Sequence, residues 1–171
     1  MSVPRALGGT AALLMALVAC ASARTAGDSG ATTADTVSVV TLERGGCRGS
    51  CPIYSVQLRP DGRVLFTGTR FVRVIGNDSA RVTADAVAAV QRIFAERGFT
   101  QMPSEIGYGT PTCGSYATDL PTVALTLRVD DRVHRVRFDE GCRGHPAVLD
   151  TLARMIDSTG GTARWMLPTG T

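Results

Sequence analysis

Several short stretches of the chain alternate apolar and polar residues, which is the pattern of β-strands with one buried face. The cleanest alternation runs over 54–59 and resumes over 64–66 after a turn at 60–62, which predicts a hairpin. A β-branched run at 37–43 predicts a strand before this hairpin, and 71–75 predicts a fourth strand after it. The first half of the chain is therefore expected to form four strands in succession.

Two later stretches have the period of an amphipathic helix. Thr83 is expected to cap the first helix, which runs to Arg97 and stops at Gly98. Pro146 suits the first turn of the second helix, which ends at Gly160-Gly161. The predicted apolar faces consist of Val87, Val90, Ile93 and Phe94 in the first helix and of Leu149, Leu152 and Ile156 in the second.

Between these helices, the alternation over 123–129 and 133–138 predicts a second hairpin about the turn Asp130-Asp131. The stretch 100–120 has no period and predicts a long loop that is either functional or tied down. The resulting order is ββββ-α-ββ-α. It predicts an α+β fold with a mainly antiparallel sheet of about six strands and both helices packed on one face, in a single domain over 37–167.

The N-terminal segment has the features of an export leader. Arg5 precedes an apolar core at 11–19, which is too short for a span that needs about 20 apolar residues. The residues Leu17-Val18-Ala19-Cys20 resemble the lipobox of bacterial lipoproteins, which implies removal of 1–19 and acylation of Cys20. Ordinary cleavage after Ala21-Ser22-Ala23 is the alternative, and it would give a secreted or periplasmic soluble protein.

The residues after the leader are small and polar, so 20–36 is expected to form a flexible tether. An acylated Cys20 would attach the protein to a membrane through its lipid. Ala21 follows the cysteine in place of an aspartate, which by resemblance to sorting in two-membrane bacteria implies the outer membrane, with the domain facing the periplasm.

Charge adds little to this picture. The whole chain has 18 basic and 15 acidic residues, and the leader takes away one arginine and no acid, so the remainder stands at 17 minus 15, or +2. No basic run interleaved with aromatic residues is present, so nucleic acid is not expected as a partner. No cofactor-binding motif is found.

Four cysteines follow the tether: Cys47, Cys51, Cys113 and Cys142. An even number in an oxidising compartment predicts two disulfides, for which three connectivities are possible. Register about the Asp130-Asp131 turn places residue 142 opposite residue 119, near the base of the loop that holds Cys113, so a bridge between Cys113 and Cys142 is feasible. That bridge would leave Cys47 to pair with Cys51.

A thiolate metal or redox site is the alternative interpretation. Cys47, Cys51, Cys142 and His145 offer three thiolates and an imidazole with the spacing of a tetrahedral zinc site. The run Cys47-x₃-Cys51-Pro52 is also similar to the copper-binding motif of cytochrome-oxidase assembly proteins. Here, however, Pro52 leads into an alternating strand, and no helix N-terminus is expected at Cys47 to lower its pKa.

Other polar residues are expected to have structural roles. His134 shares a face with apolar residues of its strand, Asp119 precedes a proline-bearing turn, and Arg48 is expected in solvent. Trp165 is expected to pack the end of the chain onto the domain. No Ser-His-Asp or paired-carboxylate arrangement is found, so the sequence assigns no catalytic residue.

Several short motifs extend over roughly Thr41 to Trp165. They are Cys47-x-Gly49-x-Cys51-Pro52-x-Tyr54, Asp61-Gly62 followed by Phe66-x-Gly68, Thr118-Asp119-Leu120-Pro121-Thr122, Gly141-Cys142, and Trp165. With these motifs the chain resembles a bacterial family known as domain of unknown function 6438, although Cys113 departs from its pattern. The resemblance implies an exported or lipid-anchored protein with a small α+β fold and no assigned activity. A non-enzymatic binding or structural role in the cell envelope, with an unidentified small-molecule or protein ligand, is therefore expected.

Overall fold

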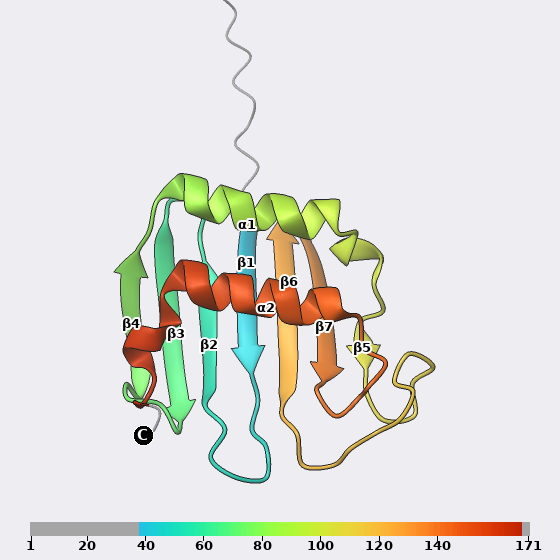
Figure 1. Cartoon of the computed structure of the whole chain (residues 1–171). Helices are drawn as coiled ribbons and strands as arrows, with labels where there is room; N and C mark the ends of the chain where they lie inside the picture. Colours follow the sequence, from blue (N-terminus) through green and yellow to red (C-terminus); the bar gives the residue numbers. More distant parts are fainter. Residues whose placement is uncertain (1–37, 169–171) are drawn as a thin grey trace, which may run out of the picture. The chain divides into compact units, whose positions relative to one another are not determined.

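Seven β-strands and two α-helices make up residues 38–168, which are the residues described by this computed structural model (Figure 1). In chain order the elements are β1 (Ser38–Arg44), β2 (Ile53–Leu58), β3 (Arg63–Arg70), β4 (Gly76–Arg81), α1 (Ala84–Glu96), the 3₁₀ turn η1 (Phe99–Gln101), β5 (Glu105–Ile106), β6 (Thr122–Val129), β7 (Arg132–Asp139), α2 (Ala147–Gly160) and the 3₁₀ turn η2 (Thr162–Trp165).

The strands form one sheet in the order β4-β3-β2-β1-β6-β7-β5. All neighbouring strands are antiparallel except β5 and β7, which are parallel. Strand β1 lies at the centre and joins two meanders, because it pairs with β2 on one side and with β6 on the other. The α+β class and the mainly antiparallel sheet predicted from the sequence are confirmed.

Both helices cross the same face of the sheet (Figure 1). This face is apolar because alternate residues of each central strand point to it, including Leu42, Val56 and Leu125, which are fully buried. Helix α2 packs on β1, β2 and β6, and α1 packs on α2 and on β1. Within residues 38–168, no helix covers the opposite face of the sheet.

The helix ends follow the predicted chemistry. The Thr83 side chain accepts a hydrogen bond from the Ala86 amide at 3.2 Å, which caps the start of α1. Gly98 adopts the left-handed conformation just after the α1 C-cap, with φ of 64°. Gly161, with φ of 62°, does the same after α2. Pro146 is the N-cap residue of α2 and so lies just outside its first turn.

The predicted fourth strand was misplaced. It was expected over 71–75, but β4 is formed by Gly76–Arg81. Phe71 takes a positive φ of 55°, and the Arg73 amide donates to the carbonyl of Trp165 at 2.8 Å, so this stretch packs against the chain end. The true β4 lacks an apolar alternation because it is an edge strand, and Asn77 and Ser79 on its open face are exposed.

The expected strand number was also too low. Strand β5 lies within 100–120, which was expected to be a loop throughout, and its two residues add to the sheet edge beside β7. Ile106 supplies the only inward-facing side chain of this strand and is fully buried. A strand of two residues is too short to give any period in the sequence.

The predicted leader 1–19, the acylation site Cys20 and the tether 20–36 lie outside the described residues. Among the described residues, no helix is long and apolar enough to cross a membrane.

Candidate functional site

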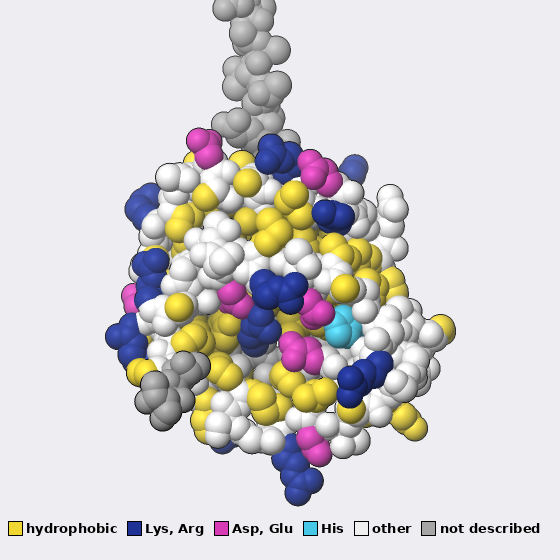
Figure 2. Space-filling model, viewed as in Figure 1, with side chains coloured by type: hydrophobic (Ala, Val, Ile, Leu, Met, Phe, Trp, Pro, Cys, Tyr) yellow, Lys and Arg dark blue, Asp and Glu magenta, His cyan; other side chains and the backbone are white. Residues whose placement is uncertain are grey.

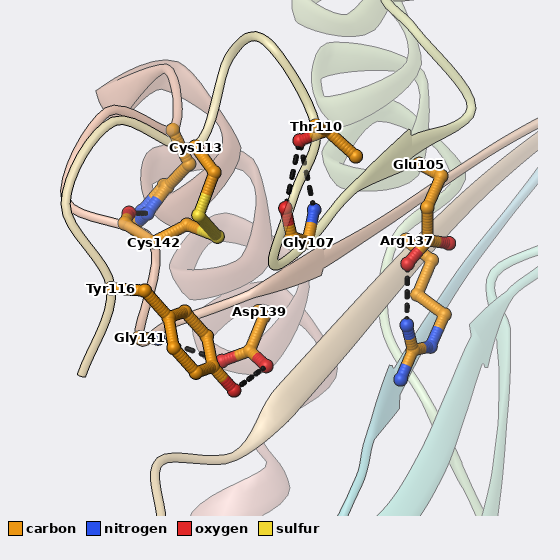
Figure 3. Close-up of a disulfide and its surroundings, with 10 residues drawn as sticks. Glu105, Gly107, Thr110, Cys113, Tyr116, Arg137, Asp139, Gly141 and Cys142 are labelled. Carbon is orange, nitrogen blue, oxygen red and sulfur yellow. Dashed lines mark hydrogen bonds and ion pairs between the residues drawn. A yellow bond between two sulfur atoms is a disulfide. The ribbon is translucent and has the colours of Figure 1, made fainter. Parts of the chain in front are cut away.

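Two disulfides lie at the same end of the sheet, where β1 ends and β2 begins and where β7 ends. Cys47 and Cys51 close the connection between β1 and β2, with their Cα atoms 5.7 Å apart. Cys113 and Cys142 join the loop after β5 to the connection between β7 and α2, with a Cα separation of 4.6 Å (Figure 3). Of the three connectivities open to the sequence, this is the one that hairpin register favoured.

The register predicted for the second hairpin holds within its strands but not in the loop that precedes β6. Thr122 pairs with Asp139 as predicted, but Cys142 forms an isolated antiparallel β-bridge with Tyr116 and does not lie opposite residue 119. Asp119 takes a positive φ of 72° just before β6, where the chain leaves the ladder. The Gly144 amide donates to the Cys113 carbonyl at 2.9 Å, so the two cysteine segments are also tied through their backbones.

The residues proposed for a thiolate metal site are not gathered around one point. Cys47 and Cys51 lie in one bridge and Cys142 in the other, and among residues 38–168 no three His, Cys, Asp or Glu side chains form a group that could hold a metal ion. His145 instead bonds through Nδ1 to the Cys142 carbonyl at 2.6 Å and through Nε2 to Asp150 at 3.0 Å. The thiolate alternative requires both bridges to be reduced, and it remains a prediction.

Both ring nitrogens of His145 face oxygen acceptors. Burial alone would lower the pKa of this imidazole, but the hydrogen bonds to Asp150 and to the Cys142 carbonyl raise it overall, as do the charges of Asp150 and Glu140. The protonated ring can donate to both acceptors, whereas a neutral ring can donate to only one. With both nitrogens occupied, His145 serves to hold the turn after Cys142 against α2.

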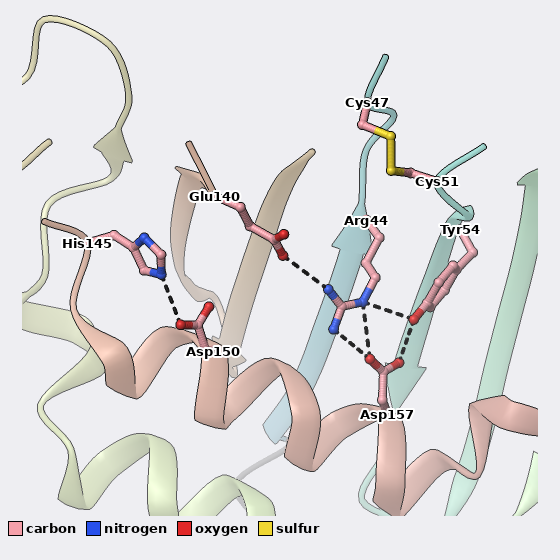
Figure 4. A network of polar contacts seen from close by, with 8 residues as sticks. All are labelled: Arg44, Cys47, Cys51, Tyr54, Glu140, His145, Asp150 and Asp157. Atoms are coloured by element: carbon pink, nitrogen blue, oxygen red, sulfur yellow. Dashed lines mark hydrogen bonds and ion pairs between the residues drawn. A yellow bond between two sulfur atoms is a disulfide. The ribbon is translucent and has the colours of Figure 1, made fainter. Parts of the chain in front are cut away.

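A polar cluster connects α2 to the ends of β1 and β2 (Figure 4). Asp157 of α2 accepts hydrogen bonds from the Tyr54 hydroxyl at 2.8 Å, from Arg44 Nη2 at 2.8 Å and from the Thr162 hydroxyl at 3.1 Å. Arg44 Nε also donates to the Tyr54 hydroxyl at 3.0 Å. The Arg44 guanidinium lies 3.5 Å from Glu140 as well.

Burial and charge fix the protonation of this cluster. Burial, with the added charge of Asp157, raises the pKa of Tyr54 well above its ordinary value. Burial acts to lower the pKa of Arg44, but Tyr54 and Asp157 raise it overall. Partial burial raises the pKa of Glu140, and the nearby Arg44 opposes that rise.

Figure 2 shows charged side chains of both signs and a histidine gathered near the middle of the helix-covered face. The cluster holds α2 on the sheet and leaves no unpaired nucleophile.

A groove of about 390 Å³ lies on the face of the sheet opposite the helices. We call it the open-face groove, and its lining consists of Thr41, Glu43, Arg44, Gly45, Ile53, Tyr54, Ser55, Thr67, Thr69, Thr122, Val123, Ala124, Arg135 and Arg137. Its volume falls within the roughly 300–1,000 Å³ of small-molecule sites. Five of the lining residues are Thr or Ser, and they come from β1, β2, β3 and β6. The groove is therefore assembled from three consecutive strands and from β6, which lies about fifty residues later in the sequence than β3.

Two ion pairs lie along one side of this groove. Arg135 binds Glu43 in a two-pronged arrangement, with Nη2 at 2.9 Å from Oε2 and Nη1 paired with Oε1. The hydrogen bonds from Arg135 lower the pKa of Glu43. Arg137 Nη1 lies 2.5 Å from Glu105 of β5 (Figure 3). The groove therefore presents guanidinium donors and carboxylate acceptors side by side, with little net charge.

The comparison with family models covers most of the described chain: residues 38–160 match the model described as domain of unknown function, DUF6438. The chain belongs to this family. No curated protein matches it. The DUF6438 match spans all seven strands, both helices, both disulfides and the open-face groove, and it ends before Trp165.

The motifs on which the resemblance rested are largely structural in this DUF6438 domain. Tyr54 anchors α2, as described above. A Cβ on Gly68 would lie 2.0 Å from the Val74 carbonyl oxygen, so only glycine fits there. A Cβ on Gly141 would lie 2.1 Å from the Ala117 carbonyl oxygen, with the same consequence.

The remaining residues singled out in the sequence also have structural surroundings. Trp165 is buried, stacks on Phe66 at 4.5 Å between ring centroids and donates to Asp78 at 2.7 Å. The Asp119 carbonyl accepts from the Arg48 amide at 3.2 Å, while the Arg48 side chain is 84% exposed.

His134 lies on the apolar face of β7, with its ring edge-on to Phe99. Its buried Nε2 has no hydrogen-bond partner among the described residues.

Sequence reasoning missed two sets of residues. Asp157 and Glu140 gave no signal, because their partners lie far away in the chain, 103 residues apart for Asp157 and Tyr54. The groove hydroxyls were visible only as the polar half of the strand alternation. From the sequence, such residues are interpreted as the solvent-exposed face of a sheet, and only the order of the strands shows that they lie together.

Proposed function

We propose that this chain is an exported, lipid-anchored protein of the bacterial envelope, whose DUF6438 domain binds a saccharide in the open-face groove. The export leader and the lipobox at 17–20 support attachment through Cys20, with the outer membrane as the site. Two disulfides among four cysteines fit an oxidising compartment. No catalytic residue is part of the proposal, because the polar clusters described above are mutually paired.

The groove carries the proposal. The side chains of Thr41, Ser55, Thr69 and Thr122 make no hydrogen bond to other described residues, although they line a concave surface. Their hydroxyls can each donate and accept, and the neighbouring Arg–Glu pairs add both kinds of group. A ligand that replaces their hydration must offer donors and acceptors in similar number, since an unpaired polar group is costly once it is covered.

A saccharide meets this requirement better than the other ligand classes. Most small-molecule pockets are lined mainly by hydrophobic and aromatic residues, whereas ten of the fourteen residues that line this groove carry a hydroxyl or a charged group. An extended peptide would be expected to pair with the backbone of a strand edge, but the groove lies on the face of the central strands, whose edges are occupied. The lining holds three guanidinium groups, and each is paired with a carboxylate. Arg135 pairs with Glu43, Arg137 with Glu105 and Arg44 with Asp157, so no strong attraction for a polyanion results.

The binding test uses the chain from Cys20 onward and two probes, a chito-oligosaccharide and a malto-oligosaccharide. Calorimetry and amide chemical shifts are expected to show saturable binding of at least one probe at Thr41, Ser55 and Thr122. A Thr41→Val and Ser55→Ala double variant should weaken binding about thirtyfold, because two hydrogen bonds of about 1 kcal/mol each, about 2 kcal/mol together, are lost.

The matched control is Thr151→Val, an exposed hydroxyl on α2 across the sheet from the groove. It should bind with unchanged affinity. Absence of binding to either probe, or equal affinity in the double variant, would overturn the saccharide proposal.

Mass spectrometry of the exported protein tests attachment and the state of the thiols. We expect an acylated Cys20 at the N-terminus, and a free N-terminus at Arg24, after Ala23, would contradict the anchor. Alkylation without reduction should leave the other four cysteines unmodified. Two or more alkylated thiols together with bound zinc or copper would favour the metal-binding alternative built on Cys47, Cys51, Cys142 and His145.

A further inference from the structure

The two disulfides differ sharply in their access to solvent. Cys113 is 2% exposed and Cys142 is fully buried. Cys47 and Cys51 are both partly exposed, and the residues between them, 48–50, are all exposed. Thiol–disulfide exchange needs a thiolate to reach a bridge sulfur, so access governs which bridge reacts. Only the Cys47–Cys51 bridge offers that access in the folded protein.

The accessible bridge also borders the open-face groove. Gly45 and Ile53, the residues that lead into and out of the bridged turn, both line the groove. The Gly45 amide donates to the Thr122 carbonyl at 2.7 Å, which holds this end of the groove against β6. Gly46 packs so closely under Ile53 that a Cβ there would lie 3.1 Å from its Cδ1. The bridge thus fixes the chain on both sides of one groove wall.

We propose that Cys47–Cys51 is a thiol–disulfide exchange site for an external dithiol, and that its reduction loosens the Gly45–Ile53 end of the groove. A thiolate of the dithiol attacks one bridge sulfur, forms a mixed disulfide and releases the other cysteine as a thiolate. The second thiol of the reagent then resolves the mixed disulfide. The reagent leaves oxidised, and two electrons and two protons pass to Cys47 and Cys51.

The exchange step is tested on the exported protein with dithiothreitol, followed by acid quenching, alkylation and peptide mass spectrometry. Cys47 and Cys51 should become alkylated at least tenfold faster than Cys113 and Cys142. Unfolding in urea should remove most of this difference, since it exposes both bridges. Equal rates in the folded protein, or faster reaction of Cys113–Cys142, would overturn the exchange site.

The groove consequence is tested with a Cys47→Ser and Cys51→Ser double variant, which mimics the reduced state and keeps the buried bridge. Amide chemical shifts should change at Gly45, Ile53 and Thr122 and stay constant along α2. Unchanged shifts at the groove end would refute the loosening. A third measurement, the affinity for saccharide, should fall at least threefold in the variant. This measurement alone rests on the proposed function. Selective reduction and the shift changes are measured without any saccharide, so their success or failure is independent of whether one binds.

Discussion

Removal of the Tyr54 hydroxyl should destabilise the fold through the contact between α2 and the sheet. In Tyr54→Phe the ring remains, together with its contact to Phe66, whose centroid lies 5.7 Å away. Tyr54 is buried, with 6% of its surface exposed. The hydroxyl that the substitution removes donates a hydrogen bond to the Asp157 carboxylate at 2.8 Å. Hydrogen bonds to charged groups contribute about 1.5–3 kcal/mol. Because the Thr162 hydroxyl still donates to the same oxygen atom, we expect a loss of about 1.5–2 kcal/mol, toward the lower end of that range.

The assay is equilibrium unfolding in urea, followed by the fluorescence of Trp165, the one tryptophan of the chain. Tyr54→Phe should lower the midpoint without changing the slope with denaturant. Asp157→Asn should lower the free energy of unfolding by more, roughly 2–3 kcal/mol. It removes the charged partner of Arg44, whose side chain is only 24% exposed and so is poorly solvated. In the double variant the two effects should fall short of their sum by about 1 kcal/mol, because the residues share one hydrogen bond.

Tyr116→Phe is the matched control. Its hydroxyl also donates to an aspartate, Asp139 at 3.0 Å, but on the exposed surface. Its loss should leave the unfolding free energy unchanged within error. If Tyr54→Phe behaves like Tyr116→Phe, or if the Tyr54 and Asp157 effects are additive, the cluster does not hold α2 in the way we describe.

Three further changes test other parts of the fold. Gly68→Ala places a Cβ against the Val74 carbonyl and should cost at least 2 kcal/mol in urea unfolding, so a loss below about 0.5 kcal/mol would refute the close contact. Thr83→Ala removes the α1 cap and should cost about 1 kcal/mol, with the loss of helicity visible by circular dichroism; an unchanged midpoint would argue against the cap. The raised pKa of His145 means that its stabilisation is fully present below the unfolded value of about 6.5 and is lost as the pH rises through the folded value. The stability difference between wild type and His145→Gln should therefore be larger at about pH 5.5 than at about pH 8.5, and the opposite order would contradict the pairing with Asp150.

The sequence predicts those parts of this fold whose pattern is local. The period of two over 54–58 and the capping hydroxyl of Thr83 depend on neighbours within a few residues, so both could be recognised. Strand β4 could not, because an edge strand with one open face needs few apolar residues, and Gly76–Arg81 contains one alanine and no larger aliphatic residue. Strand β5 exists only because β7 is there to pair with it.

The sequence analysis predicted the two disulfides of the candidate site but not the open-face groove. The even number of cysteines and the oxidising compartment that the leader predicts limit the possible disulfide pairings to three, and hairpin register favoured one of them. The groove has no comparable constraint, since Thr41, Ser55 and Thr122 become neighbours only through the order β2-β1-β6. That order depends on the pairing of β1 with β6, which lies about eighty residues later in the chain, and no local sequence pattern indicates this pairing.

The central position of β1 also determines the order in which the molecule can fold. As the chain emerges N-terminus first, from a ribosome or across a membrane, residues 38–81 can form β1 to β4 at once through short turns. One edge of β1 then stays open until Thr122–Val129 has emerged, because β6 is the strand that pairs with this edge among residues 38–168. Such long-range pairing is slow to form, and an apolar strand edge left open is a site for aggregation. The first meander is therefore not a folding unit by itself, and a chain that stops before β6 should depend on chaperones to stay soluble.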